Sequence, residues 1–112
     1  MPKKISIAYH IVADPSEENE VTVYEVEEAR KFVTKSVRVS FPYGTNGELE
    51  VTIKRGIKQI APYRGAYQGD AEVIEDEFIE DISSGERVII RYKNNNETQV
   101  REAYVLIRGE LE

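Results

Sequence analysis

The sequence has 112 residues, no cysteine and a formal net charge of −6 at pH 7. This length fits one domain, which we place at residues 1–112, and the lack of cysteine excludes disulfides, thiolate nucleophiles and cysteine-bound zinc. Seven of the 21 acids and no base fall between Asp70 and Asp81, which leaves 14 acids against 15 bases elsewhere. A nearly neutral body with one acidic segment argues against nucleic-acid binding, which requires a net basic surface.

The first half of the chain alternates apolar and polar residues with a period of two. Such alternation is typical of antiparallel strands that have one face on a core and the other in water. It predicts strands at residues 3–13, 20–26, 32–41, 48–55 and 57–61. Residues 27–31 favour a helix by propensity, but β-branched residues flank them closely. We therefore expect a hairpin connection there, with one helical turn as the alternative.

The second half adds further strands after a loop at residues 63–70. Residues 72–82 are predicted to hold one or two short strands, and residues 87–93 and 98–108 one strand each. About eight short strands without a credible helix predict an all-β protein, an antiparallel β-sandwich. A jelly roll is the favoured form. An immunoglobulin-like sandwich is the alternative, although the paired cysteines and the core tryptophan of that fold are missing.

Two hairpins are predicted from the turns between these strands. Asn46-Gly47 tolerates the positive φ that a tight turn needs, so we expect residues 32–41 and 48–55 to pair across it. The asparagines that follow residues 87–93 form a second turn, and we expect residues 98–108 to pair back across that turn.

Catalytic chemistry has little support in the sequence. His10 is the only histidine, and general acid–base catalysis normally needs a nucleophile or an orienting carboxylate beside such a residue. On a predicted strand, His10 is expected to face solvent or to be hydrogen-bonded. Pairs of carboxylates occur in any chain this acidic, so a carboxylate-based hydrolase is kept only as an alternative. We predict a non-enzymatic protein.

The acidic segment offers oxygen ligands of the kind that Ca²⁺ prefers. The candidate ligands are Asp70, Glu72, Glu75, Asp76 and Glu77. Their spacing is not that of a calcium-binding loop, and apolar residues are interleaved with them. A strand whose charges discourage pairing with another sheet is therefore the favoured interpretation, and calcium binding and an interface with a basic partner are the alternatives. No other cofactor is expected.

The loop before the acidic segment is the main candidate for recognition. Tyr63, Arg64, Tyr67 and Gln68 lie in it, and Tyr43 lies in an earlier loop. Tyrosine and arginine dominate binding hot spots, so these residues are predicted to contact a protein partner. The three tyrosines could alternatively stack on a sugar, as in a carbohydrate-binding module. Against both, the favoured interpretation of Tyr63 and Tyr67 is that they only cover one end of the sandwich.

The segments VRVSFP at residues 37–42 and GERVIIRYKNN at residues 85–95 give the chain a pattern that resembles small single jelly-roll proteins. Proteins of that kind occur in viral and prophage-derived contexts and in thermophiles. The resemblance implies a structural or assembly role and self-association as a homo-oligomer. No apolar run has the length of a membrane span or the form of a signal peptide, so we expect a cytoplasmic or virion-associated location. The charged fraction of 32% fits a thermophile protein, and an ordinary charged surface fits equally.

Overall fold

The computed structural model describes residues 2–112, and the regular secondary structure of these residues is entirely β-strand. The strands are β1 (Lys3–Ala13), β2 (Glu18–Glu25), β3 (Lys31–Phe41), β4 (Leu49–Arg55), β5 (Lys58–Ala61), β6 (Glu72–Glu77), β7 (Asp81–Ser83), β8 (Arg87–Asn94) and β9 (Arg101–Leu111). Each predicted strand is present, with small shifts at its ends. Residues 2–112 contain no helix with the length and hydropathy that a membrane span requires.

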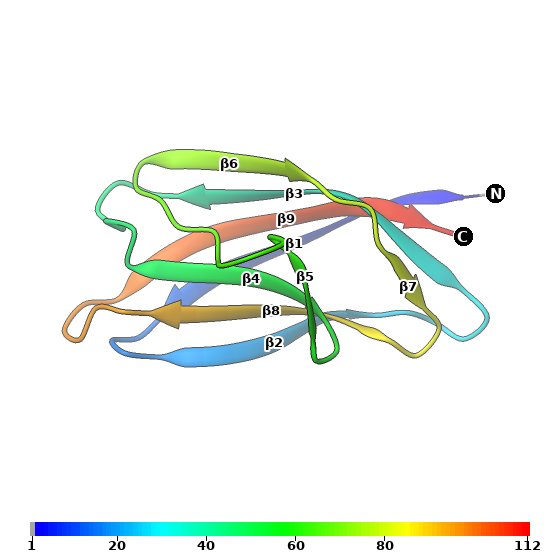
Figure 1. The fold of residues 1–112 in the computed structure, drawn as a ribbon, viewed down its shortest axis with the longest axis horizontal. Coiled ribbons are helices and arrows are strands. Elements are labelled where there is room, and N and C mark those ends of the chain that lie inside the picture. The colour runs from blue at the N-terminus through cyan, green and yellow to red at the C-terminus, as the bar shows by residue number, and fades with distance from the viewer. Residues whose placement is uncertain (1) are drawn as a thin grey trace.

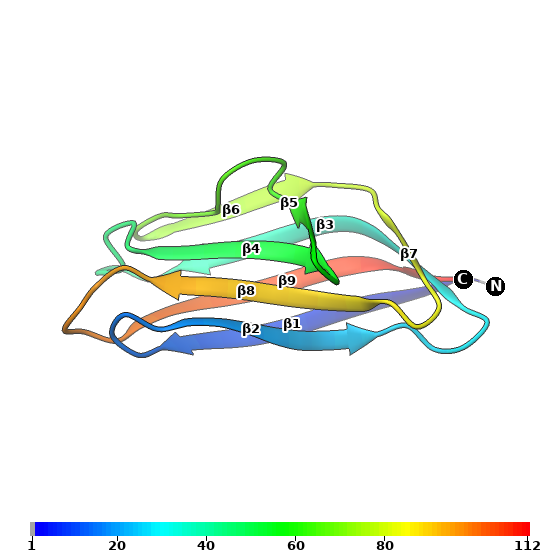
Figure 2. The ribbon, with the colours of Figure 1, turned by 60° about the horizontal axis from the view of Figure 1, so that its bottom comes forward.

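The strands form two antiparallel sheets that pack face to face. One sheet, here called the β1 sheet, has the order β1-β9-β3-β6, with β7 also paired to β3; the other, the β2 sheet, has the order β2-β8-β4-β5. Figure 2 shows the β2 sheet in front of the paler β1 sheet. The first and last strands pair with each other, and most connections cross between the sheets (Figure 1). This is the topology of a jelly roll, so the predicted fold class is confirmed.

Both predicted hairpins are wrong. β3 and β4 belong to different sheets, and so do β8 and β9. The turn itself is as expected, because Asn46 and Gly47 have φ angles of 54° and 67° and the Glu48 amide donates to the Thr45 carbonyl at 3.0 Å. A turn reverses the chain but does not choose the sheet that the next strand joins. The intervening residues are enough to carry the chain across the sandwich.

The expected hairpin at residues 27–31 is also absent, since β2 and β3 lie in different sheets. Neither does this segment form a helical turn: it is a turn with Ala29 at a φ of 62°. Among the described residues, the only consecutive strands that pair are β4 and β5.

The core lies between the sheets and is built from the inward-facing residues of each strand. Burying one such aliphatic side chain stabilises the fold by about 1.5–3 kcal/mol. The largest fully buried side chains include Ile11, Phe32, Leu49, Ile53, Ile82, Ile90 and Ile107. Gly109 makes room for this packing. A Cβ atom there would lie 2.4 Å from the Val33 carbonyl oxygen and 2.7 Å from the Phe32 ring.

The predicted strand region at residues 72–82 is divided into β6 and β7, which both pair with β3. Thr34, which is fully buried, holds the interruption in place. Its hydroxyl donates to the Phe78 carbonyl at 3.1 Å and accepts from the Glu80 amide at 2.9 Å. The break therefore leaves β6 as a short separate strand at the edge of the β1 sheet.

Candidate functional site

The predicted loop contacts divide into exposed and buried residues. Tyr43 and Tyr63 are 90% and 89% exposed, and the Arg64 guanidinium carbon lies 5.7 Å from the centre of the Tyr63 ring. Tyr67 is only 6% exposed. Gln68 is engaged within the protein, because its side-chain amide donates to the Gly47 carbonyl at 2.9 Å. Only part of the predicted contact surface is thus free to meet a partner.

Tyr67 is held inside the fold, which leaves its ring little surface for the contact predicted from the sequence. It forms a β-bridge with Val51 through hydrogen bonds of 2.8 and 3.0 Å, and this bridge turns its ring into the core. Its hydroxyl donates to an Asp76 carboxylate oxygen at 2.7 Å. Burial, and then the neighbouring carboxylate, raise the pKa of Tyr67 well above its usual value. The predicted three-tyrosine sugar platform therefore lacks its third ring.

The acids predicted as calcium ligands are dispersed. Asp70 accepts from the Gly44 amide at 2.7 Å, Asp76 accepts from the Tyr67 hydroxyl, and Glu75 pairs with Arg38. Within residues 2–112, no three histidine, aspartate or glutamate side chains gather into a group that could hold a metal ion. The other two proposed ligands, Glu72 and Glu77, are exposed residues of β6.

His10 has the hydrogen-bonded strand position expected from the sequence. Its Nε2 atom lies 3.0 Å from the Glu102 carboxylate on β9. Its ring stacks on Tyr104, with the ring centres 4.4 Å apart and the planes 8° from parallel. These residues lie on the outer face of the β1 sheet, which turns away from the core.

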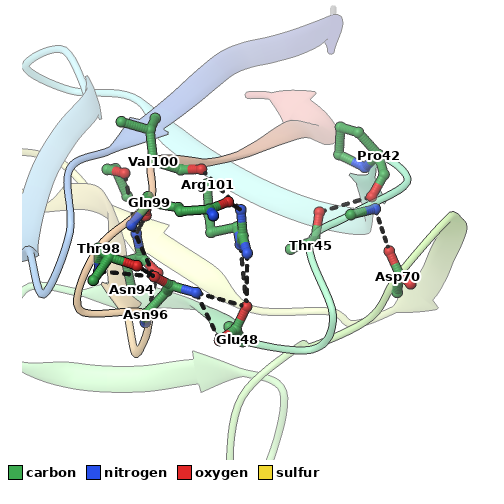
Figure 3. A network of polar contacts seen from close by, with 12 residues as sticks. Pro42, Thr45, Glu48, Asp70, Asn94, Asn96, Thr98, Gln99, Val100 and Arg101 are labelled. Carbon is green, nitrogen blue, oxygen red and sulfur yellow. Dashed lines mark hydrogen bonds and ion pairs between the residues drawn. The ribbon is translucent and has the colours of Figure 1, made fainter.

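A polar network closes one end of the sandwich (Figure 3). The Asn94 side chain, which is buried, donates to the carbonyls of Ala13, Asp14 and Gln99 at 2.9–3.2 Å. Nearby, the Arg101 guanidinium pairs with Glu48 at 3.0 Å. Among the described residues, no buried side-chain nitrogen or oxygen lacks a hydrogen-bond partner. The network therefore fastens the ends of strands and keeps no buried polar group free for a ligand.

The sheet edges differ in how far they are protected against pairing with another chain. Proteins protect an edge by making it short, charged or bulged. β5 has four residues and is followed by Pro62, and β6 has six residues, of which four are acidic. β2 contains a bulge between Thr22 and Tyr24, and its Glu18 and Glu20 pair with basic residues of the same sheet.

The fourth edge, β1, has none of these protections along most of its length. Its 11 residues pair with β9 without a bulge, from Lys3 opposite Leu111 to Ala13 opposite Arg101. Apart from this pairing with β9, no hydrogen bond joins the backbone of residues 3–12 to another segment of residues 2–112. The outward-facing backbone groups are therefore open to a partner.

This open edge was missed in the sequence interpretation, although one signal was present. No aspartate, glutamate, lysine or arginine occurs between Lys4 and Asp14, so nothing in the strand itself discourages pairing. What the sequence does not reveal is that this strand lies at an edge, because that depends on which strands become its neighbours.

Comparison with solved structures agrees with the topology. The fold is similar to that of a phage capsid protein. In the acid-stable capsid of Helicobacter pylori bacteriophage KHP30, the similar chain shares 13% identity over 97% of this chain and 93% of its own length, with a TM-score of 0.54. In the VP2 subviral particle of infectious bursal disease virus, identity is 12% over 98% of this chain and 36% of that chain, with a TM-score of 0.49.

A pilus protein of Bacillus endospore appendages shares 10% identity over 96% of this chain and 87% of that chain, with a TM-score of 0.45. No protein-family model matches the sequence, and neither does any curated protein sequence. At such identities, similarity of structure establishes the fold and nothing about function.

Proposed function

We propose that this protein is a non-enzymatic structural module that assembles with further copies of itself through the edge of β1. The observation that carries the proposal is the contrast between the four edges. β2, β5 and β6 are bulged, short or charged, whereas β1 is long, regular and uncharged between Lys4 and Asp14. The phage protein of similar fold comes from a capsid. A viral or prophage origin and a virion-associated location belong to the same proposal.

An open edge favours association for two physical reasons. The unpaired N–H and C=O groups of β1 are a template for another strand, and each hydrogen bond formed there contributes about 0.5–1.5 kcal/mol net. Beneath them, the inward-facing Ile5 and Tyr9 are only partly buried, so a further strand would remove more apolar surface from water. Backbone pairing and apolar burial thus act together along one strand.

The test is the molar mass of the protein in solution, measured by light scattering behind a sizing column. We compare the wild type with Ala8→Lys on β1 and with Thr22→Lys on β2, both of which change exposed edge positions. We expect a discrete wild-type oligomer, its loss in Ala8→Lys and its retention in Thr22→Lys, because a charge on an edge strand disfavours pairing. A wild type that remains monomeric at all concentrations tested would refute the proposal.

A further inference from the structure

We infer that the partner at the β1 edge is β1 of a second copy, running antiparallel, with a two-fold axis at Ala8. This inference rests on the proposed self-assembly and specifies its geometry. Its starting observations are the open backbone of β1, the alternation of its side chains and the distribution of charge along the strand. A two-fold contact is closed, since the same surface of each copy meets the other.

The charges near β1 favour the antiparallel direction. On the strand itself, Lys3 and Lys4 lie at the start and Asp14 follows the end. On β9, Glu110 lies opposite Lys4, Glu102 opposite Val12, and Arg101, which is paired with Glu48, opposite Ala13. An antiparallel partner places the basic start of each strand next to the acidic end of the other, and it does so twice. A parallel partner would instead bring the two pairs of lysines together, and like charges directly across a sheet are destabilising.

The alternation of side chains restricts the register. From Ile5 on, the odd-numbered residues of β1 are buried or half-buried toward the core, while the even-numbered residues are exposed on the outer face. Paired residues lie on the same face of a sheet, so an odd residue must face an odd one, and a slip by one residue is excluded. Among the permitted registers, the one that pairs the whole of residues 3–13 with itself places Ala8 opposite Ala8 of the second copy.

This register matches side chains on both faces of the strand. On the core side, Ile5 faces Ile11 of the second copy and Ile7 faces Tyr9, so the half-buried residues of the open edge become covered by apolar neighbours. On the outer side, the axis passes between two alanines, which leave the strands free to approach. Because Ala8 lies beside Leu106 of β9, an apolar row of two alanines and two leucines forms across the axis.

The assembly would contain one continuous sheet. Its order is β6-β3-β9-β1 in one copy, followed by β1-β9-β3-β6 in the second copy. In Figure 2, β2 lies in front of β1 at the same edge of the sandwich, but the bulge between Thr22 and Tyr24 interrupts β2. A bulge bends a strand and terminates regular pairing. The β2 sheets are therefore expected to end at the interface.

The experiment uses single cysteines, since the chain contains none of its own. In Ala8→Cys, the two cysteines face each other with Cα atoms about 4.5–5.5 Å apart, which a disulfide can bridge. In the matched control Ser6→Cys, each cysteine faces residue 10 of the other copy. The two cysteines are then four residues apart along the strand direction, about 13 Å, which is too far for a disulfide. Both positions are exposed on the same face, so both variants should fold alike.

Under mild oxidation we expect Ala8→Cys to shift from monomer to dimer on a non-reducing gel, and Ser6→Cys to remain a monomer. A mixture of Ser6→Cys and His10→Cys should give a mixed dimer, because residues 6 and 10 are opposite in this register. That mixture tests the same geometry without changing Ala8.

The outcomes separate this inference from the proposed function. If light scattering shows a wild-type oligomer but neither Ala8→Cys nor the mixture is cross-linked, the two-fold pairing is wrong and self-assembly stands. If Ser6→Cys is cross-linked as readily as Ala8→Cys, the disulfides report random collision and the register is refuted. If the wild type is a monomer, both the inference and the proposed function fail.

Discussion

Tyr63 and Tyr67 lie four residues apart in one loop, and the structure gives them opposite roles. Replacing Tyr67 by serine removes a ring that is 6% exposed, and replacing Tyr63 removes one that is 89% exposed. Truncating a buried aromatic residue costs about 3–5 kcal/mol. An exposed substitution usually stays within about 0.5 kcal/mol, and losing the exposed contact of the Tyr63 ring with Arg64 costs about 0.5–1 kcal/mol. We therefore expect Tyr67→Ser to remove a large part of the stability and Tyr63→Ser to remove at most about 1 kcal/mol.

The hydroxyl of Tyr67 can be separated from its ring by a third variant, Tyr67→Phe. It keeps the ring and loses only the 2.7 Å hydrogen bond to Asp76. A hydrogen bond to a charged group contributes about 1.5–3 kcal/mol, and the half-buried Asp76 carboxylate can recover part of that from water. We expect Tyr67→Phe to lose stability near the lower end of this range. The loss of stability should therefore increase in the order Tyr63→Ser, Tyr67→Phe, Tyr67→Ser.

Urea denaturation followed by circular dichroism measures the free energy of unfolding of all three variants and the wild type. A shift in the midpoint without a change in slope shows that stability alone has changed. Equal losses for Tyr63→Ser and Tyr67→Ser would refute the assignment of separate roles. So would a Tyr67→Ser variant as stable as the wild type, because the ring could not then belong to the core.

Three further predictions concern alkaline pH, one buried hydroxyl and one close contact. The pKa of Tyr67 is raised in the fold by burial and then by the carboxylate beside it. The stability that protonated Tyr67 contributes is therefore fully present below about pH 10. Above that pH it falls by about 1.4 kcal/mol per pH unit, because Tyr67 ionises in the unfolded chain before it does in the fold. In the same alkaline titration, Tyr67→Phe should lose stability less steeply than the wild type. Thr34→Val removes the hydroxyl that accepts from the Glu80 amide, and leaving buried groups unpaired should cost about 1–3 kcal/mol in urea denaturation; an unchanged midpoint would contradict the role given to that hydroxyl. Gly109→Ala brings a Cβ atom to 2.4 Å from the Val33 carbonyl oxygen, so overpacking should lower stability by about 1–3 kcal/mol, and a neutral thermal melt would show that the sheet yields there.

The strands were predictable because, in a half-buried strand, the polarity of each residue indicates whether it faces the core or the solvent. Val37, Val39 and Phe41 are buried, as their alternation with polar residues requires. Which strand pairs with which has no comparable signal in the sequence, since an apolar face can be buried against any other apolar face. The turn at Asn46-Gly47 showed where the chain reverses, and the hairpin inferred from it was wrong because the loop changes sheets.

The candidate surfaces were less predictable for a related reason. Tyr67 lies in a loop without periodicity, so the sequence offers no sign of which side it faces, and a single bridge to Val51 decides its burial. β6 could be interpreted as a charged strand from its acids, and the structure places it at an edge. The open edge of β1 arises from topology alone because, among residues 2–112, its only neighbour in the sheet is β9, the most distant strand in sequence.

The pairing of β1 with β9 has a consequence for how the molecule folds. β9 lies between β1 and β3, so the last strand in chain order occupies the interior of its sheet (Figure 1). Until β9 leaves the ribosome, β1 has no partner on either side and β3 lacks one of its neighbours. Contacts between residues so far apart in sequence also make folding slow, commonly milliseconds to seconds for β-sandwiches. The sheet with the open edge is thus completed only after β9 has been synthesised. Before that, both sides of β1 carry unpaired backbone groups, whereas in the folded protein only one side does.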